Sequence, residues 1–160
     1  MVMSFTLNSL SETETLAGRF ASCLHQGDVV GLTGSLGVGK SAFARAAILS
    51  QCDNVDDVPS PTFTLVQQYD ARSGLALWHM DLYRLQDPEE VFALGVEDAF
   101  IDAACLVEWP ERMGGFWPND AIMITLDRGE DDSRHITITA GDDFINRLTD
   151  LVKENAPHLL

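Results

Sequence analysis

Basic residues are scarce in this chain, which carries 10 Lys and Arg residues against 25 Asp and Glu residues. The formal net charge at pH 7 is −15, and the only lysines are Lys40 and Lys153. Because phosphate neutralisation requires clustered Lys and Arg side chains, this composition excludes a protein that binds nucleic acid on its own. Any role in a nucleic-acid pathway is therefore expected to run through a partner protein, and a surface this acidic favours docking on a basic one.

Cysteine and long apolar runs are also lacking. Cys23, Cys52 and Cys105 are widely spaced and form no C-x-x-C pair, which is typical of buried, reduced thiols in a cytosolic protein. No stretch approaches the length of a membrane span, and no basic segment followed by an apolar run marks a leader. We therefore expect a cytoplasmic protein without membrane contact. Its length and its 46% hydrophobic content predict a single domain over residues 1–160.

The most informative segment that is present is Gly34-Ser35-Leu36-Gly37-Val38-Gly39-Lys40-Ser41, which fits the phosphate-binding pattern G-x-x-x-x-G-K-S/T. Its glycines let the backbone approach phosphate oxygens closely and turn N–H groups toward them. Lys40 would reach the β- and γ-phosphates, and the Ser41 hydroxyl would bind Mg²⁺. The residues expected to hold the nucleotide are Leu36, Gly37, Val38, Gly39, Lys40 and Ser41.

The flanks of this loop are those that the motif requires. Residues 28–33 form an apolar run that predicts a buried strand, and residues 41–49 have the composition of a helix with a small-residue face. Further along, strand-like runs at 63–69 and 75–81 are joined by turn residues at 70–74 and predict an antiparallel hairpin.

Predicted strands and helices alternate along the rest of the chain. A capping box of Ser11 and Glu14 starts a helix that reaches Gln26, and the segment 87–90 opens another helix that Gly95 ends. The other predicted elements are strands at 4–8, 104–109, 121–126 and 134–139, a turn or two at 96–101, and a helix at 142–154. The pattern predicts an α/β fold, namely a three-layer, P-loop NTPase-like domain whose mixed sheet includes an antiparallel hairpin.

Hydrolysis of a nucleotide also needs a metal ligand and a positioned water, and in P-loop enzymes the metal carboxylate ends a buried strand. Asp81 and Glu108 both follow apolar strand-like runs, and spacing alone does not decide between them. His79 would share the strand face of Asp81, where it either contacts the site or packs as a core histidine.

Thr62 lies between the loop helix and the next predicted strand, in the segment 60–64. GTPase-like proteins carry their γ-phosphate sensor at this place in the chain. The hydroxyls of this segment either hold the metal or the attacking water, or else Pro61 and the threonines simply start a strand.

Together these segments resemble the bacterial TsaE family, formerly YjeE, the small ATPase of tRNA threonylcarbamoyladenosine biosynthesis. The matching stretches run in the family's order over most of the chain, and their combination is highly specific. They are residues 34–41, Ser60-Pro61-Thr62-Phe63-Thr64-Leu65-Val66, His79-Met80-Asp81-Leu82-Tyr83-Arg84-Leu85, Asp87-Pro88-Glu89-Glu90 and Leu106-Val107-Glu108-Trp109-Pro110. Ser41 stands where many members carry Thr, a change that keeps the hydroxyl ligand.

The resemblance implies an ATPase with ATP and Mg²⁺ as cofactors that works with the TsaB–TsaD pair and meets tRNA only through that complex. TsaD transfers the threonylcarbamoyl group to the adenosine beside the anticodon, and TsaE looks like the component that resets the complex between turnovers. The same resemblance places Ser41 and Glu108 on the metal. It gives catalytic roles to Lys40, to Asp81, which would orient or activate the water, and to Thr62, which would belong to a nucleotide-sensing switch.

Two positions match the family more weakly. The segment around Thr13 would flank the adenine, and Arg134 aligns with a family region near the nucleotide. An arginine that merely decorates a strand edge is an equally good interpretation of Arg134.

Two other functions compete with this one. A small-molecule kinase shares the loop but generally needs extra arginines around the acceptor and a lid, whereas the arginines here are scattered. A GTPase would carry the guanine-binding motif N-K-x-D, which neither lysine supplies. We therefore expect ATP in preference to GTP, with weak hydrolysis by the isolated chain because no arginine finger is evident.

Overall fold

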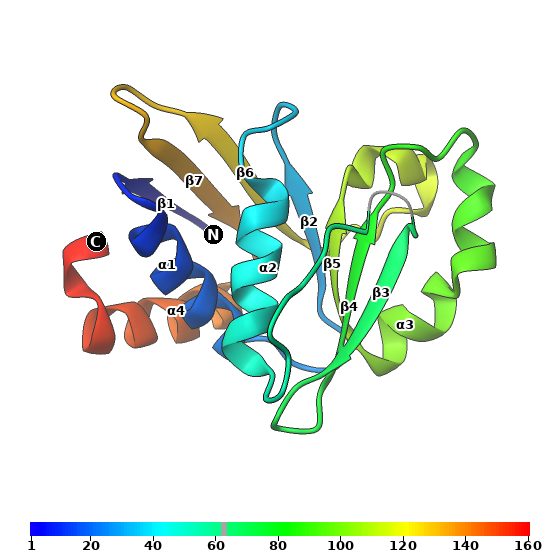
Figure 1. The fold of residues 1–160 in the computed structure, drawn as a ribbon, viewed down its shortest axis with the longest axis horizontal. Coiled ribbons are helices and arrows are strands. Elements are labelled where there is room, and N and C mark those ends of the chain that lie inside the picture. Colours follow the sequence, from blue (N-terminus) through cyan, green and yellow to red (C-terminus); the bar gives the residue numbers. More distant parts are fainter. Residues whose placement is uncertain (62–63) are drawn as a thin grey trace.

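The computed structural model describes residues 1–61 and 64–160. Within these residues, seven strands form one sheet in the order β1-β7-β6-β2-β5-β4-β3 (Figure 1). In that order the strands are β1 (Val2–Leu7), β7 (Arg134–Thr139), β6 (Ile122–Arg128), β2 (Val29–Thr33), β5 (Ala104–Glu108), β4 (Ala76–Asp81) and β3 (Val66–Asp70).

The middle of the sheet is parallel and its two sides are antiparallel. β2 pairs in parallel with β6 and β5, and β5 pairs in parallel with β4. β1, β7 and β6 are antiparallel neighbours on one side, and β3 and β4 form the predicted hairpin on the other. The mixed sheet is therefore confirmed. Since parallel strands point the same way, the carboxyl ends of β2, β5 and β4 lie at one edge, where ligands bind in open α/β sheets.

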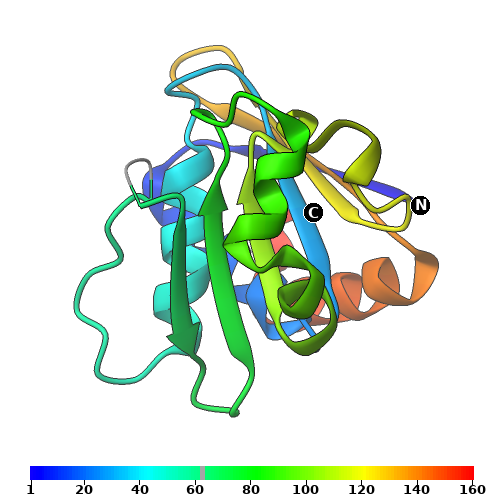
Figure 2. The ribbon, with the colours of Figure 1, turned by 90° about the vertical axis from the view of Figure 1, so that its right-hand side faces the viewer.

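Helices cover both faces of the sheet (Figures 1 and 2). One face carries α1 (Leu10–Ser22), α2 (Lys40–Gln51) and α4 (Asp142–Asn155), and the other carries α3 (Val96–Asp102) with the 3₁₀ helices η1 (Pro88–Leu94) and η2 (Pro110–Phe116); η3 (Pro157–Leu159) follows α4. Each face has its own buried apolar cluster. On the α2 face the ring of Phe20 packs edge-on against Phe43 and Phe144, with centroids 5.7 and 5.2 Å away. The predicted three-layer α/β fold is confirmed.

The pleat of β4 and β5 decides which side chains face α2. Leu77 and Leu106 belong to the cluster under α2, whereas Met80 and Val107 belong to the cluster on the α3 face. Side chains two residues apart on a strand share a face. His79 and Asp81 therefore follow Leu77 toward α2, and Glu108 follows Leu106.

The first helix begins and ends earlier than the sequence predicts. Its N-cap is Ser9, whose Oγ accepts a hydrogen bond from the Glu12 amide at 3.1 Å, so the predicted capping box of Ser11 and Glu14 is wrong. The helix ends at Ser22 rather than Gln26, because the amide of Cys23 turns back to the carbonyl of Phe20. The polar residues at this terminus offer two similar caps, and at the earlier one the Asn8 amide also donates to Glu12 Oε2 at 2.6 Å.

The remaining boundaries shift only slightly. The helix predicted from Asp87 is the 3₁₀ helix η1, with the Asp87 amide donating to Glu90 Oε1 at 3.1 Å and Gly95 following it at φ 84°. The turns predicted at 96–101 form α3. Thr62 and Phe63, the second of which is the predicted start of a strand, lie outside the described residues, and β3 is Val66–Asp70.

All three cysteines are free and buried, as predicted. Burial raises the pKa of the Cys105 thiol to about 12 and that of Cys23 to about 11, which leaves little reactive thiolate at neutral pH. Within residues 1–61 and 64–160, no helix has the length and hydropathy needed to cross a bilayer.

Candidate phosphate-binding and metal site

At two positions, the loop that joins β2 to α2 adopts a backbone conformation that favours glycine. Gly34 has φ 142°, and a Cβ there would clash with the carbonyl oxygen of Leu126. Gly39 has φ 119° and is the N-cap of α2. The helix begins at Lys40, so its unpaired first amides and the positive end of its dipole lie at the loop. Strand, glycine loop and helix N-terminus together form the backbone of an anion site.

Lys40 lies across this loop and is 5% exposed. Its Nζ donates to the carbonyl oxygens of Gly34 at 2.6 Å and Ser35 at 3.1 Å. Nζ also lies 4.2 Å from the ring centroid of Trp109, a cation–π contact. Burial lowers the pKa of Lys40, and the nearby carboxylates Glu108, Glu111 and Asp81 oppose that shift.

Trp109 reaches this position through an unusual backbone conformation. Its φ of 59° and ψ of 51° fall in the left-handed region, which is uncommon for a bulky residue. Its ring packs on the ring of Tyr83, with centroids 5.0 Å apart. The Arg112 guanidinium lies over the Tyr83 ring. The aromatic pair therefore forms one wall beside the Lys40 ammonium.

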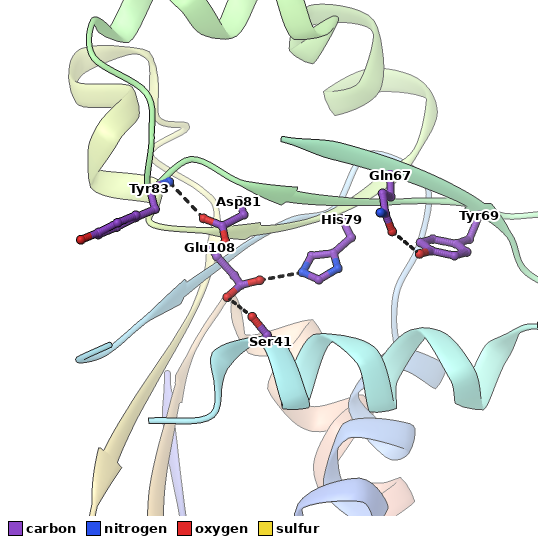
Figure 3. A network of polar contacts seen from close by, with 7 residues as sticks. All are labelled: Ser41, Gln67, Tyr69, His79, Asp81, Tyr83 and Glu108. Atoms are coloured by element: carbon purple, nitrogen blue, oxygen red, sulfur yellow. Dashed lines mark hydrogen bonds and ion pairs between the residues drawn. The ribbon is translucent and has the colours of Figure 1, made fainter. Parts of the chain in front are cut away.

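Glu108 accepts hydrogen bonds on both carboxylate oxygens (Figure 3). Ser41 Oγ, from the first turn of α2, donates to Oε1 at 2.7 Å, and Oε2 lies 2.8 Å from Nε2 of His79 on β4. Glu108 is 2% exposed and His79 is fully buried. Of the two alternatives for His79, contact with the site is the one that the structure shows.

Asp81 ends β4 directly opposite Glu108 in the parallel register. Its Oδ1 accepts a hydrogen bond from the Tyr83 amide at 3.0 Å, which fixes the carboxylate at the strand end (Figure 3). Asp81 and Glu108 open into one cavity of about 340 Å³, which we call the Lys40 cavity. Its lining is Leu36, Gly37, Gly39, Lys40, Ser41, Ala42, Arg45, Asp81, Tyr83, Arg84, Glu108 and Trp109.

A second cavity, of about 170 Å³, shares Gly39 and Ala42 with the first, and we call it the Arg134 cavity. It contains both weaker family matches, Thr13 from α1 and Arg134 from β7. Arg134 does more than decorate a strand, because its Nε donates to the carbonyl of Val38 in the loop at 2.9 Å. The rest of the lining is Leu7, Ser9, Leu10, Val38, Leu126, Asp132 and Ile136.

The fold therefore gathers most of the predicted site residues around the start of α2. Thr62 lies outside the described residues, so its predicted role is neither supported nor opposed. Arg45 was missed by the sequence analysis although it lines the Lys40 cavity. The signal for it was present, because Arg45 follows Ser41 by four residues and so lies on the same helix face.

The oxygen donors at this site fit a magnesium ion. A hydroxyl and a carboxylate oxygen lie 2.7 Å apart at Ser41 and Glu108, and both are the hard ligands that Mg²⁺ prefers. No cluster of three or more His, Cys, Asp and Glu residues suited to a metal exists in the described part of the chain. Mg²⁺ does not require one, since it usually takes one or two protein ligands and completes its shell with water and phosphate.

Comparison with known proteins identifies the family. The family model described as threonylcarbamoyl adenosine biosynthesis protein TsaE matches residues 7–136. The chain belongs to the TsaE family. Proteins named tRNA threonylcarbamoyladenosine biosynthesis protein TsaE are similar to it, including one from Rickettsia bellii, 40% identical over 133 residues, which cover 83% of this chain and 92% of the relative. The Bacillus subtilis protein is 37% identical over 130 residues, covering 81% and 80%.

A solved structure shares this fold over nearly the whole chain. The crystal structure of Bacillus subtilis YdiB superposes with a TM-score of 0.75 at 28% sequence identity, covering 97% of each chain. The family match runs from residue 7 to residue 136, so it contains every residue that lines the two cavities. The part of the chain that matches the TsaE family of tRNA threonylcarbamoyladenosine biosynthesis therefore includes both cavities.

Proposed function

We propose that this chain is a Mg²⁺-dependent ATPase that acts with TsaB and TsaD in tRNA threonylcarbamoyladenosine formation. The observation that carries the proposal is the 2.7 Å contact between Ser41 and Glu108 at the N-terminus of α2, beside the buried Lys40. These residues come from segments 67 positions apart, and their meeting at the phosphate loop supplies both a hydroxyl and a carboxylate ligand. A glycine-rich turn with no nucleotide role would have no need of that pairing.

The loop and Lys40 bind the triphosphate in this proposal. The amides of Leu36 to Gly39 and the first turn of α2 receive the phosphate oxygens, where the helix dipole favours negative charge. Lys40 exchanges its two carbonyl acceptors, Gly34 and Ser35, for phosphate oxygens. Because Lys40 is already buried and directed along the loop, little side-chain entropy is lost when the nucleotide binds.

Ser41 and Glu108 would hold the magnesium ion, which would supply positive charge to stabilise the negative charge that develops on the phosphate groups. Asp81, fixed by the Tyr83 amide and one strand away from Glu108, orients the attacking water and accepts its proton. Thr62 completes the nucleotide-sensing switch. The Arg134 cavity receives the base, with Thr13 and Arg134 at its walls.

The acidic surface supports the choice of partner. A net charge of −15 disfavours direct contact with tRNA, so the substrate RNA is held by TsaB and TsaD, while this chain contributes the nucleotide cycle that resets the complex. Hydrolysis by the isolated chain is slow in this proposal, because a partner is needed to order the switch and complete the charge stabilisation.

The test compares nucleotide binding and turnover for the wild-type chain and the variant Glu108→Gln, with Glu97→Gln on the exposed surface of α3 as the matched control. We expect ATP to bind more tightly in Mg²⁺ than in EDTA for the wild type and the control, and the Mg²⁺ advantage to disappear in Glu108→Gln. ATP should bind more tightly than GTP, and turnover should rise when TsaB and TsaD are added. Identical titrations for wild type and Glu108→Gln would refute the metal site, and turnover that required an added small metabolite would indicate a kinase instead.

A further inference from the structure

We propose that His79 is a positioning residue for the metal site, holding the Glu108 carboxylate in the orientation that presents Oε1 to Ser41 and the magnesium ion. This inference rests on the proposed function. It concerns a side chain that would not itself contact nucleotide or metal, because it lies wholly buried beneath Glu108.

The Glu108 carboxylate accepts hydrogen bonds from two layers of the fold, the helix α2 and the sheet. Ser41 approaches Oε1 from α2, and His79 approaches Oε2 from the neighbouring strand of the sheet (Figure 3). His79 pairs with Leu106 in the β4–β5 register. Leu106 precedes Glu108 by two residues, so His79 lies on the same face of the sheet as Glu108. Its ring therefore reaches the carboxylate from the interior, leaving the outward oxygen for ligands in the Lys40 cavity.

The direction of the hydrogen bond follows from the chemistry of the two groups. A carboxylate oxygen only accepts hydrogen bonds, so Nε2 of His79 is the donor. Within the described residues, the other ring nitrogen, Nδ1, is buried and has no hydrogen-bond partner. Glu108 is therefore the polar contact that accounts for an imidazole at this place, since an aliphatic side chain would fill the same space without burying an unpaired nitrogen.

Loss of this donor has a defined consequence for the metal ligand. Oε2 would be buried without a partner, a state that the carboxylate relieves by rotating toward Ser41 or Lys40 with both oxygens. Oε1 would then no longer be fixed where the metal needs it. Partners that orient a metal ligand typically change metal affinity or activity about 10- to 100-fold when removed. In the part of the chain that the structure describes, the His79 ring forms no hydrogen bond with the loop or Lys40, so the affinity of these groups for phosphate should be unchanged.

The test uses two amide variants that differ in where they place a donor. His79→Gln carries its amide nitrogen near the position of Nε2, whereas His79→Asn is shorter and carries it near Nδ1, out of reach of Glu108. A non-hydrolysable ATP analogue is titrated by calorimetry in EDTA and at a series of Mg²⁺ concentrations, with thermal unfolding recorded for each protein. We expect His79→Asn to need about tenfold more Mg²⁺ for half of the metal-dependent gain in affinity, with unchanged affinity in EDTA. His79→Gln should stay within about threefold of wild type on both measures.

Two results would overturn the inference: a His79→Asn variant with the Mg²⁺ dependence of wild type, or equal impairment of the Asn and Gln variants. Glu108→Gln separates this failure from failure of the proposed function. If wild type and Glu108→Gln respond to Mg²⁺ alike, the metal site itself is wrong and both proposals fall. If these two differ while His79→Asn behaves as wild type, only the role of His79 is wrong.

A measurement on the wild-type chain covers the case in which the variants do not fold. Long-range ¹H–¹⁵N spectra of the ring report which nitrogen carries the proton. We expect the Nε2–H tautomer with a slowly exchanging proton, and a change in its shift when Mg²⁺ and ADP are added together. A proton on Nδ1 alone, or a resonance that does not respond to the metal–nucleotide pair, would contradict the inference.

Discussion

The Lys40 cavity and the Arg134 cavity meet at Gly39 and Ala42 but are built by opposite halves of the sheet. Parallel strands β2, β5 and β4 end at the Lys40 cavity, and the ends of β4 and β5 place two carboxylates there side by side. Antiparallel strands β1, β7 and β6 wall the Arg134 cavity, mainly with the apolar side chains Leu7, Leu126 and Ile136. The ends of the parallel strands bring charged side chains together at one edge of the sheet, whereas the antiparallel strands contribute mainly apolar walls. We therefore expect the first cavity to set affinity and turnover and the second to tune base preference.

The largest effect is expected from Lys40→Ala, which removes the buried cation from the charged cavity. Loss of its charge-assisted bonds to phosphate should cost about 3 kcal/mol, or roughly a 100-fold weakening of ATP affinity. Calorimetric titration measures this, and Lys153→Ala, at the only other lysine, is the matched control. Retained affinity in Lys40→Ala would mean that the charged cavity does not dominate binding.

Asp81→Ala should separate binding from turnover within the same cavity. Asp81 ends β4 opposite Glu108 but is not a proposed metal ligand, so ATP affinity should stay within about twofold while hydrolysis falls about 100-fold, the usual contribution of a positioned general base. Asp98→Asn on the exposed surface of α3 serves as the control. Steady-state phosphate release measures hydrolysis, and the calorimetric titration measures ATP binding. Normal hydrolysis by Asp81→Ala would show that Asp81 has no role in the mechanism.

Arg134→Ala should have a smaller effect, because it acts through the second cavity. The variant loses the bond from Nε to the Val38 carbonyl, worth about 1 kcal/mol, and ATP affinity should fall about fivefold. The preference for ATP over GTP should narrow in the same titrations, whereas exposed Arg128 on the neighbouring strand should be replaceable by Ala without effect. A loss as large as that of Lys40→Ala would erase the distinction between the two cavities.

The smallest effect concerns the helix that walls the Arg134 cavity. Ser9→Ala removes the side-chain cap of α1 and should lower the free energy of unfolding by about 1 kcal/mol, measured by urea denaturation. Ser11→Ala, at the cap that the sequence favoured, should change it by no more than a few tenths of a kcal/mol. The reverse order would show that α1 begins at the later position.

The elements around the loop were predictable because their signals are local. Glycine spacing at 34–39, the apolar run before it and the small-residue helix after it depend on neighbouring residues only, and all appear where predicted. The cap of α1 was misplaced by two residues because local composition offers two serines, and in the structure Glu12 pairs with Ser9 and Asn8. The strand order was beyond the sequence, because pairing of β1 with β7 joins opposite ends of the chain.

The site shows the same division. Residue types at strand ends identified Asp81 and Glu108 as candidates, but which of them meets Ser41 depends on the register between β4, β5 and α2. That choice came from resemblance to the TsaE family, and in the structure Glu108 is the carboxylate that accepts a hydrogen bond from Ser41. The contact of His79 with Glu108 likewise stayed undecided, because an imidazole on a buried strand face is equally common in plain packing. Arg134 reached the loop only through the return of β7 to the sheet.

The bond between Arg134 and Val38 has a consequence for how the chain is made. Its partners stand 96 residues apart, and those of the Ser41–Glu108 contact stand 67 apart. A polypeptide emerging from the ribosome therefore carries its glycine loop first. The Glu108 carboxylate is added later, and the Arg134 guanidinium later still. Under the proposed function, the complete ATP site therefore exists only after most of the chain has been synthesised.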